Sequence, residues 1–290
     1  MLFRDYFKIE EDECVIGKRI INNTSNTTLT IQAYSDTCIK FIDGYGKIHI
    51  LQTFGDWHYY DLAREHGAVF YIEGVDSVGK ATQTKLLKDK LEENGEDVLV
   101  FSYPNYESIC GKFIKEYLNG SLGDAGDVLP KLIGAFYALD RAADMASVRS
   151  HYEEGGVVIM DRSPYSNAAF QGSKGKTTQE RLELFDWFIE LEFGHLNMQK
   201  PTAVFFLDAE PAVARELMAT RAASASVDAE GKQDQHESNE SMLQLAHALY
   251  RVECEANEKW HSLNVVEDGV IRTPQSIADS IYEKVELHLY

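Results

Sequence analysis

The sequence has 290 residues, of which 44% are hydrophobic and 26% are charged, as expected for a globular protein with one substantial domain and a small extra module. Its formal net charge of −19 at pH 7 argues against broad binding to a nucleic-acid backbone, which depends on clustered Lys and Arg. No apolar run approaches the ~20 residues of a membrane span, and the acidic N-terminus lacks a secretory apolar core, so a cytoplasmic protein without membrane contact is expected.

Residues 1–66 differ from the rest of the chain and are predicted to form a small β-rich module. Short β-prone runs at Thr28–Ile31 and Cys38–Ile42 are followed by a turn at Asp43–Gly46 and a returning strand at Lys47–Leu51. The pattern resembles short β-rich segments of phage-encoded proteins, in which case the location would be the host cytoplasm. Two roles stay open: a surface for a partner or a second copy, and a structural cap on the main domain.

Residues 67–290 alternate strand-like and helix-like segments, which predicts an α/β domain. The expected fold is a three-layer P-loop fold, with a five-stranded parallel sheet and helices on both of its faces. The predicted strands are Ala68–Glu73, Val98–Tyr103, Val157–Asp161, Ala203–Asp208 and Leu263–Val266, and the segments Arg181–Leu196 and Pro211–Arg221 are predicted helices. Ligands of such sheets collect at the carboxyl ends of the strands, so the site is expected there.

The first of these strands runs into the sequence GVDSVGK at Gly74–Lys80 and then into an amphipathic helix. Backbone N–H groups of a glycine-rich turn and a helix N-terminus converge on an anion, and Lys80 adds a mobile positive charge for the outer phosphates. A glycine-rich turn can also serve only to join a strand to a helix. Ala81 stands where the general motif has a Ser or Thr ligand for Mg²⁺, so carboxylates, water and the nucleotide must hold most of the metal.

Two further patterns indicate nucleotide chemistry. Tyr137 and Arg141 are four residues apart on one predicted helix face, where they would clamp a base, although a core tyrosine and a solvated arginine give the same spacing. Asp161 and Arg162 end the third strand; the Asp would orient hydrated Mg²⁺ and the Arg would hold a phosphate, while a surface ion pair is the plain alternative.

Residues 222–241 are small and polar, without apolar periodicity, and are expected to form a mobile lid or a plain flexible loop. The cations in and beside this segment would enter the site on closure. Arg221 is the leading candidate for a catalytic cation, before Arg215 and Lys232. The four cysteines form no C-x-x-C pair and the nine histidines no H-E-x-x-H spacing, so no zinc site or disulfide framework is predicted.

Six motifs, taken together, are similar to those of the thymidylate kinases, in the same order and at similar intervals. They are GVDSVGKATQTKLL, YPNYESICGKFIKEYLNG, YALDRAADM, VIMDRSPYSNAAFQG, KPTAVFFLDAEP and DQHES. The likeness covers about residues 68–288 and leaves residues 1–66 outside it. It implies transfer of the γ-phosphoryl group of ATP to a pyrimidine deoxynucleoside monophosphate, above all dTMP to dTDP, with Mg²⁺ and in a homodimer.

The resemblance also assigns roles to residues. The loop and the start of its helix would bind ATP, through Gly74, Val75, Asp76, Ser77, Val78, Gly79, Lys80, Ala81 and Thr82. The acceptor nucleotide would contact Asp76, Tyr103, Pro104, Tyr106, Tyr137, Arg141, Arg162, Ser166, Phe170 and Gln171. Asp76 and Asp161 would hold the metal, and Lys80, Asp161, Arg162 and Arg221 would be catalytic.

The sequence departs from the family pattern in three places. Tyr106 stands where many members have Arg, Ser77 and Val78 stand where some have an Arg in the P-loop, and Ala81 removes a hydroxyl. The second departure moves a catalytic cation to the lid. Two alternatives therefore stay open, a kinase for dUMP or a modified deoxyuridylate, and a nucleotide-binding regulatory protein with weak turnover.

Overall fold

The computed structural model describes residues 19–22, 27–34, 38–43, 48–52, 60–63, 66–124, 127–213, 216, 239–267 and 270–289. These residues divide into two compact units, one comprising Met1–Gly67 with Glu153–Gly155, and the other Ala68–Tyr152 with Gly156–Tyr290.

The described part of the first unit is an antiparallel sheet with strand order β4-β3-β2-β1-β5. Its strands are β1 (Arg19–Asn22), β2 (Thr27–Tyr34), β3 (Cys38–Asp43), β4 (Ile48–Gln52) and β5 (Tyr60–Ala63). Strands β3 and β4 pair as a hairpin, with Ile39 opposite Leu51. Apolar side chains that alternate along β2 and β3, including Leu29, Ile31, Ile39 and Phe41, are buried. The role of this module stays a prediction.

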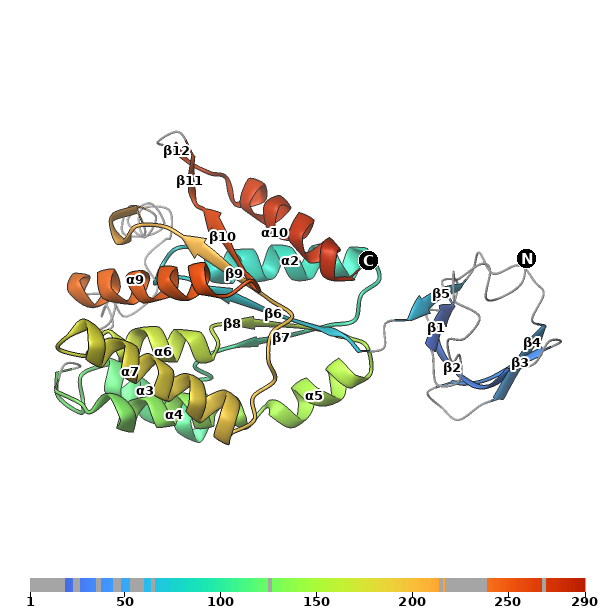
Figure 1. The fold of residues 1–290 in the computed structure, drawn as a ribbon, viewed down its shortest axis with the longest axis horizontal. Coiled ribbons are helices and arrows are strands. Elements are labelled where there is room, and N and C mark those ends of the chain that lie inside the picture. Colours follow the sequence, from blue (N-terminus) through green and yellow to red (C-terminus); the bar gives the residue numbers. More distant parts are fainter. Residues whose placement is uncertain are drawn as a thin grey trace. The chain divides into compact units, whose positions relative to one another are not determined.

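The second unit is built on a five-stranded parallel sheet with strand order β10-β9-β6-β8-β7 (Figure 1). The strands are β6 (Ala68–Glu73), β7 (Val98–Ser102), β8 (Val157–Asp161), β9 (Ala203–Asp208) and β10 (Trp260–Asn264). The inner strands β6 and β8 are buried along their whole length because helices cover both faces of the sheet. The predicted P-loop three-layer fold is confirmed.

One layer of helices holds α2 (Lys80–Glu93) and α10 (Pro274–Leu289), which pack against each other (Figure 1). On the opposite face, α6 (Pro164–Gly172) packs against α9 (Glu240–Ala256), α7 (Thr178–Ile189) and α4 (Pro130–Ala142), and α4 packs against α3 (Ile109–Leu118). Helix α5 (Met145–Glu153) leads into β8, and a short hairpin of β11 (Val266–Glu267) and β12 (Val270–Ile271) precedes α10. None of the helices in these described ranges combines the length and apolar character needed to cross a bilayer.

Within the second unit, two predicted elements differ from the structure by more than one residue. The last strand spans Trp260–Asn264 and does not begin at Leu263. Strand β10 is an edge strand that buries only Trp260 and Leu263, so no apolar run marks it. The helix predicted over Arg181–Leu196 is α7 followed by a π-helical segment, η1 (Glu190–His195). The predicted helix Pro211–Arg221 and the predicted lid lie mostly outside the described residues.

Candidate active site

The loop between β6 and α2 has the backbone shape of an anion cradle. Gly74 and Gly79 have φ angles of 145° and 109°, and Ser77 also has a positive φ of 64°. A Cβ at Gly74 would lie 3.0 Å from both the Leu207 carbonyl oxygen and the Val78 Cγ1, so only glycine fits there without strain. Helix α2 begins directly after the loop, which brings free N–H groups of its first turn to the carboxyl edge of the sheet.

Lys80 turns back onto this loop. Its Nζ donates hydrogen bonds to the carbonyl oxygens of Gly74 and Val75, at 2.9 and 2.7 Å. Burial, followed by the positive charge of Arg162, lowers the pKa of Lys80 to about 8, although Asp76 and Asp161 act in the opposite direction. An ammonium group held this close to the loop needs little movement to reach an anion in the cradle.

Arg162 follows β8 and points toward the same region. Its φ of 69° places a non-glycine residue in the left-handed region, a strained conformation that often occurs at functional sites. The guanidinium donates a hydrogen bond to Asp76 Oδ1, and Lys80 Nζ lies 4.0 Å from the same oxygen. Burial by itself would lower the pKa of Arg162, but the Asp76 carboxylate outweighs it and the net shift is upward. Two cations and Asp76 therefore meet where the strands end.

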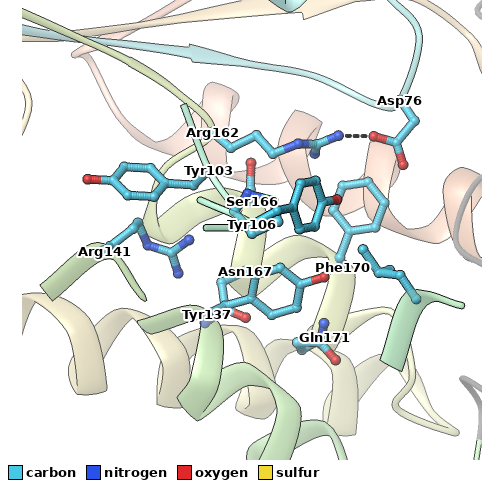
Figure 2. Close-up of a pocket in the computed structure, with 12 residues that line it drawn as sticks. Asp76, Tyr103, Tyr106, Tyr137, Arg141, Arg162, Ser166, Asn167, Phe170 and Gln171 are labelled. Carbon is cyan, nitrogen blue, oxygen red and sulfur yellow. Dashed lines mark hydrogen bonds and ion pairs between the residues drawn. The ribbon is translucent and has the colours of Figure 1, made fainter. Parts of the chain in front are cut away.

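A pocket opens beside this charge cluster and extends between α3, α4 and α6 (Figure 2). Every residue predicted to bind the acceptor nucleotide lines it, and Leu118 and Asn167 line it as well. Tyr137 and Arg141 both face the pocket, as their spacing on one helix predicted. Arg141 is 1% exposed, which rules out the solvated arginine of the alternative interpretation. The roles of these residues stay predictions.

The loop after β7 is held by two carboxylates, one in α4 and one in the turn directly after it. Asp140 accepts hydrogen bonds from the Asn105 N–H, at 2.8 Å, and from the Ser108 hydroxyl, while Asp144 accepts one from the Tyr103 hydroxyl at 3.1 Å. Burial, and then Asp144, raise the pKa of Tyr103 well above its ordinary value, so this hydroxyl stays protonated. The wall of the pocket formed by Tyr103, Pro104 and Tyr106 is thus fixed to the helix that carries Tyr137 and Arg141.

A fully buried carboxylate, Glu73, joins three elements behind the pocket. It accepts hydrogen bonds from the N–H and hydroxyl of Ser163, from the Ser166 hydroxyl and from the Tyr250 hydroxyl, at 2.5 to 2.9 Å. A buried carboxylate is stable only when donors surround it in this way. Because Ser163 follows Arg162 directly, this network also fixes the turn that presents the Arg162 guanidinium.

Two residues that line the pocket each carry a buried acceptor atom without a partner among the described residues, Asn167 Oδ1 and Gln171 Oε1. Both side chains are almost fully buried and both belong to α6, one turn apart. A buried acceptor without a donor is costly, about 1–3 kcal/mol, so a ligand that brought donors to these atoms would remove that cost.

Sequence reasoning missed Asn167, although its spacing of four residues from Gln171 on one helix was a usable signal. It also missed two buried carboxylates, Glu73 at the end of β6 and Glu192, which accepts hydrogen bonds from Arg141 and Asn167. Both contacts arise from the tertiary fold and not from the spacing of residues in the sequence. Asp161, predicted as a metal ligand, is buried at the end of β8 and does not line the pocket, but its charge acts on both Lys80 and Arg162. Arg215, Arg221 and Lys232 lie outside the described residues.

Comparisons with known proteins agree on one family. The family model described as thymidylate kinase matches residues 72–264. A thymidylate kinase of Bifidobacterium longum subsp. infantis is 32% identical over 184 residues, which are 63% of this chain and 75% of that protein. One of Schizosaccharomyces pombe is 28% identical over 151 residues, 52% of this chain and 65% of that protein.

The fold comparison points the same way. The structure of a thymidylate kinase from Candida albicans matches with a TM-score of 0.56, covering 77% of this chain and 92% of that one. At 18% identity this likeness speaks for the fold alone.

Proposed function

The chain belongs to the thymidylate kinase family, and from that premise we propose which of its residues carry the reaction. It is a nucleoside monophosphate kinase that transfers the γ-phosphoryl group of ATP to dTMP and so forms dTDP. In this step the bond between the γ-phosphorus and the β–γ bridging oxygen breaks, a bond to a dTMP phosphate oxygen forms, and ADP leaves. The protein's work is alignment and charge neutralisation, because the chemistry needs no protein nucleophile.

On the ATP side, the backbone N–H groups of Gly74–Gly79 and the first turn of α2, with Ala81 and Thr82, hold the phosphates. Lys80 exchanges its two carbonyl partners for phosphate oxygens. The position of Lys80 Nζ supports this role. It lies within 3 Å of two carbonyl oxygens of the loop, whereas the nearest oxygen of Asp76 is 4.0 Å away, beyond hydrogen-bonding distance. A charge at this place neutralises the β- and γ-phosphates during transfer.

On the dTMP side, Arg162 binds the acceptor phosphate and Tyr137 stacks on the base. Arg141 reaches the base edge, while Phe170, Gln171 and Ser166 line the nucleoside and Tyr106 takes the place of an arginine. The observation that carries this assignment is that one pocket, next to the P-loop, contains all of them together. The Arg162 guanidinium, now paired with Asp76, shifts to the phosphate when the nucleotide enters.

Asp76 and Asp161 would hold Mg²⁺ together with phosphate oxygens and water. The donor set fits, because carboxylate oxygens at strand ends are the ligands that Mg²⁺ prefers, and both carboxylates act electrostatically on Lys80. When bound, Mg²⁺ supplies neutralisation of charge on the transferred phosphoryl group. The shift of Arg162 to the acceptor phosphate would free Asp76 for the metal.

We also propose that a lid over residues 222–241 delivers a further cation, with Arg221 ahead of Arg215 and Lys232. A homodimer and a cytoplasmic location are expected from the family resemblance and from composition.

The direct test is a coupled assay of ADP formation with ATP, Mg²⁺ and each common nucleoside monophosphate in turn. We expect turnover with dTMP, weaker turnover with dUMP, and little with dCMP or the purine nucleotides. If dTMP were not among the accepted nucleotides, the assignment of the acceptor would be wrong. Nucleotide binding without any ADP formation would instead indicate a regulatory protein.

A further inference from the structure

One carboxylate from outside the pocket contacts two of the side chains that line it. Glu192 accepts hydrogen bonds from Arg141 Nε at 2.7 Å and from Arg141 Nη2 at 2.5 Å. The same Glu192 Oε1 that binds Nη2 also accepts a hydrogen bond from Asn167 Nδ2, at 2.8 Å. Glu192 does not line the pocket, whereas Arg141 and Asn167 both do.

This contact leaves the guanidinium little freedom. The side chains of Arg141 and Glu192 are 1% and 0% exposed, and a two-point bond between a guanidinium and a carboxylate fixes the plane of the fork. Nε and Nη2 are used by Glu192, and Nη1 takes part in neither bond. Glu192 therefore decides which edge of Arg141 is turned toward the pocket.

The same carboxylate fixes the orientation of the Asn167 amide. Both acceptors around Nδ2, the Gly134 carbonyl oxygen at 2.9 Å and Glu192 Oε1, require a donor at that position. A rotated amide would place its oxygen against these two oxygens. Oδ1 must therefore point away from Glu192, and it has no partner among the described residues.

The position of Glu192 comes from the π-helical segment η1. In this segment the Leu196 N–H donates to the Leu191 carbonyl oxygen, five residues earlier, and the Met198 N–H donates to the Glu192 carbonyl oxygen. A π-helical turn changes the direction of side chains relative to a continuing α-helix. Here Glu192 is fully buried, while its neighbour Glu190 is exposed.

We propose that Glu192 is a positioning residue that sets the hydrogen-bond polarity of the base pocket, a donor from Arg141 beside an acceptor from Asn167. This pair is complementary to the 4-carbonyl oxygen and the N3–H of uracil and thymine. Cytosine presents an amine donor and an unprotonated N3 at the same two positions and so places donor against donor and acceptor against acceptor. The inference rests on the proposed function in one respect, that this pocket receives the base.

Glu192→Gln tests the proposal while keeping the size of the side chain. An amide can accept on one side only, so its NH₂ group meets a donor of Arg141 or of Asn167, and the fixed polarity is lost. We expect the dissociation constants of dTMP and dUMP, measured by calorimetry without ATP, to rise together by about 10- to 100-fold. The dissociation constant of dCMP should not rise, so the dTMP-over-dCMP preference should narrow at least tenfold, and the KM for ATP should stay unchanged.

Glu190→Gln is the matched control, since it makes the same change at an exposed position of the same segment, and it should leave all three constants at parental values. A purely structural role of Glu192 would lower the folded fraction and leave the constants of the folded protein unchanged. An unchanged preference in Glu192→Gln, with dTMP and dCMP affected in parallel, would overturn the proposal.

A double variant covers the case in which the single variant fails to fold. Arg141→Met with Glu192→Met removes both buried charges at similar volume, a change that folded proteins tolerate. The proposal expects this variant to melt near the parental temperature and to lose the dTMP-over-dCMP preference; a retained parental preference would contradict it.

The parental protein separates this inference from the proposed function. If it failed to phosphorylate dTMP, the proposed acceptor would be wrong. The parental protein could instead phosphorylate dTMP while Glu192→Gln bound the three nucleotides with the parental preference. In that case the proposed function would stand and only the proposed role of Glu192 would be wrong.

Discussion

Lys80 gives the site a pH dependence whose sign follows from its environment. Its pKa, lowered by burial to about 8, leaves the side chain mostly an ammonium at pH 7 and mostly a neutral amine at pH 9. Only the ammonium attracts phosphate. We therefore expect ATP affinity, measured with a non-hydrolysable analogue, to fall by up to about tenfold between pH 7 and pH 9.

Lys80→Arg provides the control for this dependence. A guanidinium stays charged over the whole range, so the variant should bind the analogue more weakly but with a flat profile from pH 7 to pH 9. An affinity of the parental protein that does not change up to pH 9 would show that Lys80 is not the phosphate-binding charge.

Arg162 is the residue on which the acceptor phosphate depends. Arg162→Lys keeps a charge but loses the planar fork and its hold on Asp76, so we expect kcat/KM for dTMP to fall by about 100-fold or more while far-UV circular dichroism stays parental. Arg149→Lys is the comparison, because Arg149 donates to the Asn197 carbonyl oxygen and does not line the pocket. Equal activities of the two variants would show that Arg162 does not bind the acceptor phosphate.

Some residues of the site could be predicted from local sequence motifs, and others could not. The motifs around Gly74 and Arg162 are local, and the structure brings them together because each follows a strand of the same parallel sheet. Tyr137 reaches the pocket that Arg162 lines from helix α4. Glu192 lies 51 residues from Arg141 in a segment that reads as an ordinary helix. The spacing of these residues in the sequence does not predict this contact, because the tertiary fold creates it.

Among the elements, the loop after β6 is the most sensitive to a small change. In Gly74→Ala the methyl group would meet the Leu207 carbonyl oxygen and Val78, at a φ that L-residues rarely adopt. We expect the KM for ATP to rise at least tenfold and the melting temperature to drop. Gly95→Ala is the matched control: Gly95 also has a positive φ of 85°, but open space surrounds its Cβ position, so it should lose some stability and keep the parental KM.

The hydrogen bonds of Glu73 connect β6 to α6 and α9. Their contribution to the free energy of unfolding can be measured through Tyr250. Tyr250→Phe keeps the ring and removes the hydroxyl that donates to Glu73 at 2.9 Å. We expect the free energy of unfolding in urea to fall by about 1–3 kcal/mol. Tyr282→Phe, which removes a more exposed hydroxyl bonded to Asn94, should change it by less than about 0.5 kcal/mol; equal effects would mean that the buried network does not stabilise the fold.

The inner strands could be predicted from sequence because continuous burial makes them continuous apolar runs, as in Val157–Asp161. The exact bounds of strand β10 could not be predicted, because this edge strand buries only Trp260 and Leu263 and therefore has no continuous apolar run. Errors in the bounds of one strand do not change the predicted order of strands and helices, and this order determines the fold class.

At the scale of the whole molecule, the catalytic unit begins at Ala68 and the family match at residue 72, so residues 1–66 are predicted to be dispensable for chemistry. A chain lacking residues 1–60 should keep kcat and both KM values within about threefold of the full chain, measured in the coupled assay. Loss of solubility or of a dimer, seen by light scattering, would assign the module a structural role. Loss of turnover in a folded, soluble chain would contradict the prediction.

The most direct test of the central claim is a crystal structure with dTMP and a non-hydrolysable ATP analogue bound together. We predict the triphosphate on Gly74–Lys80, the dTMP phosphate on Arg162, and the thymine ring against Tyr137 and Arg141. A structure with the two phosphate groups apart, or with either nucleotide outside this pocket and loop, would contradict the account.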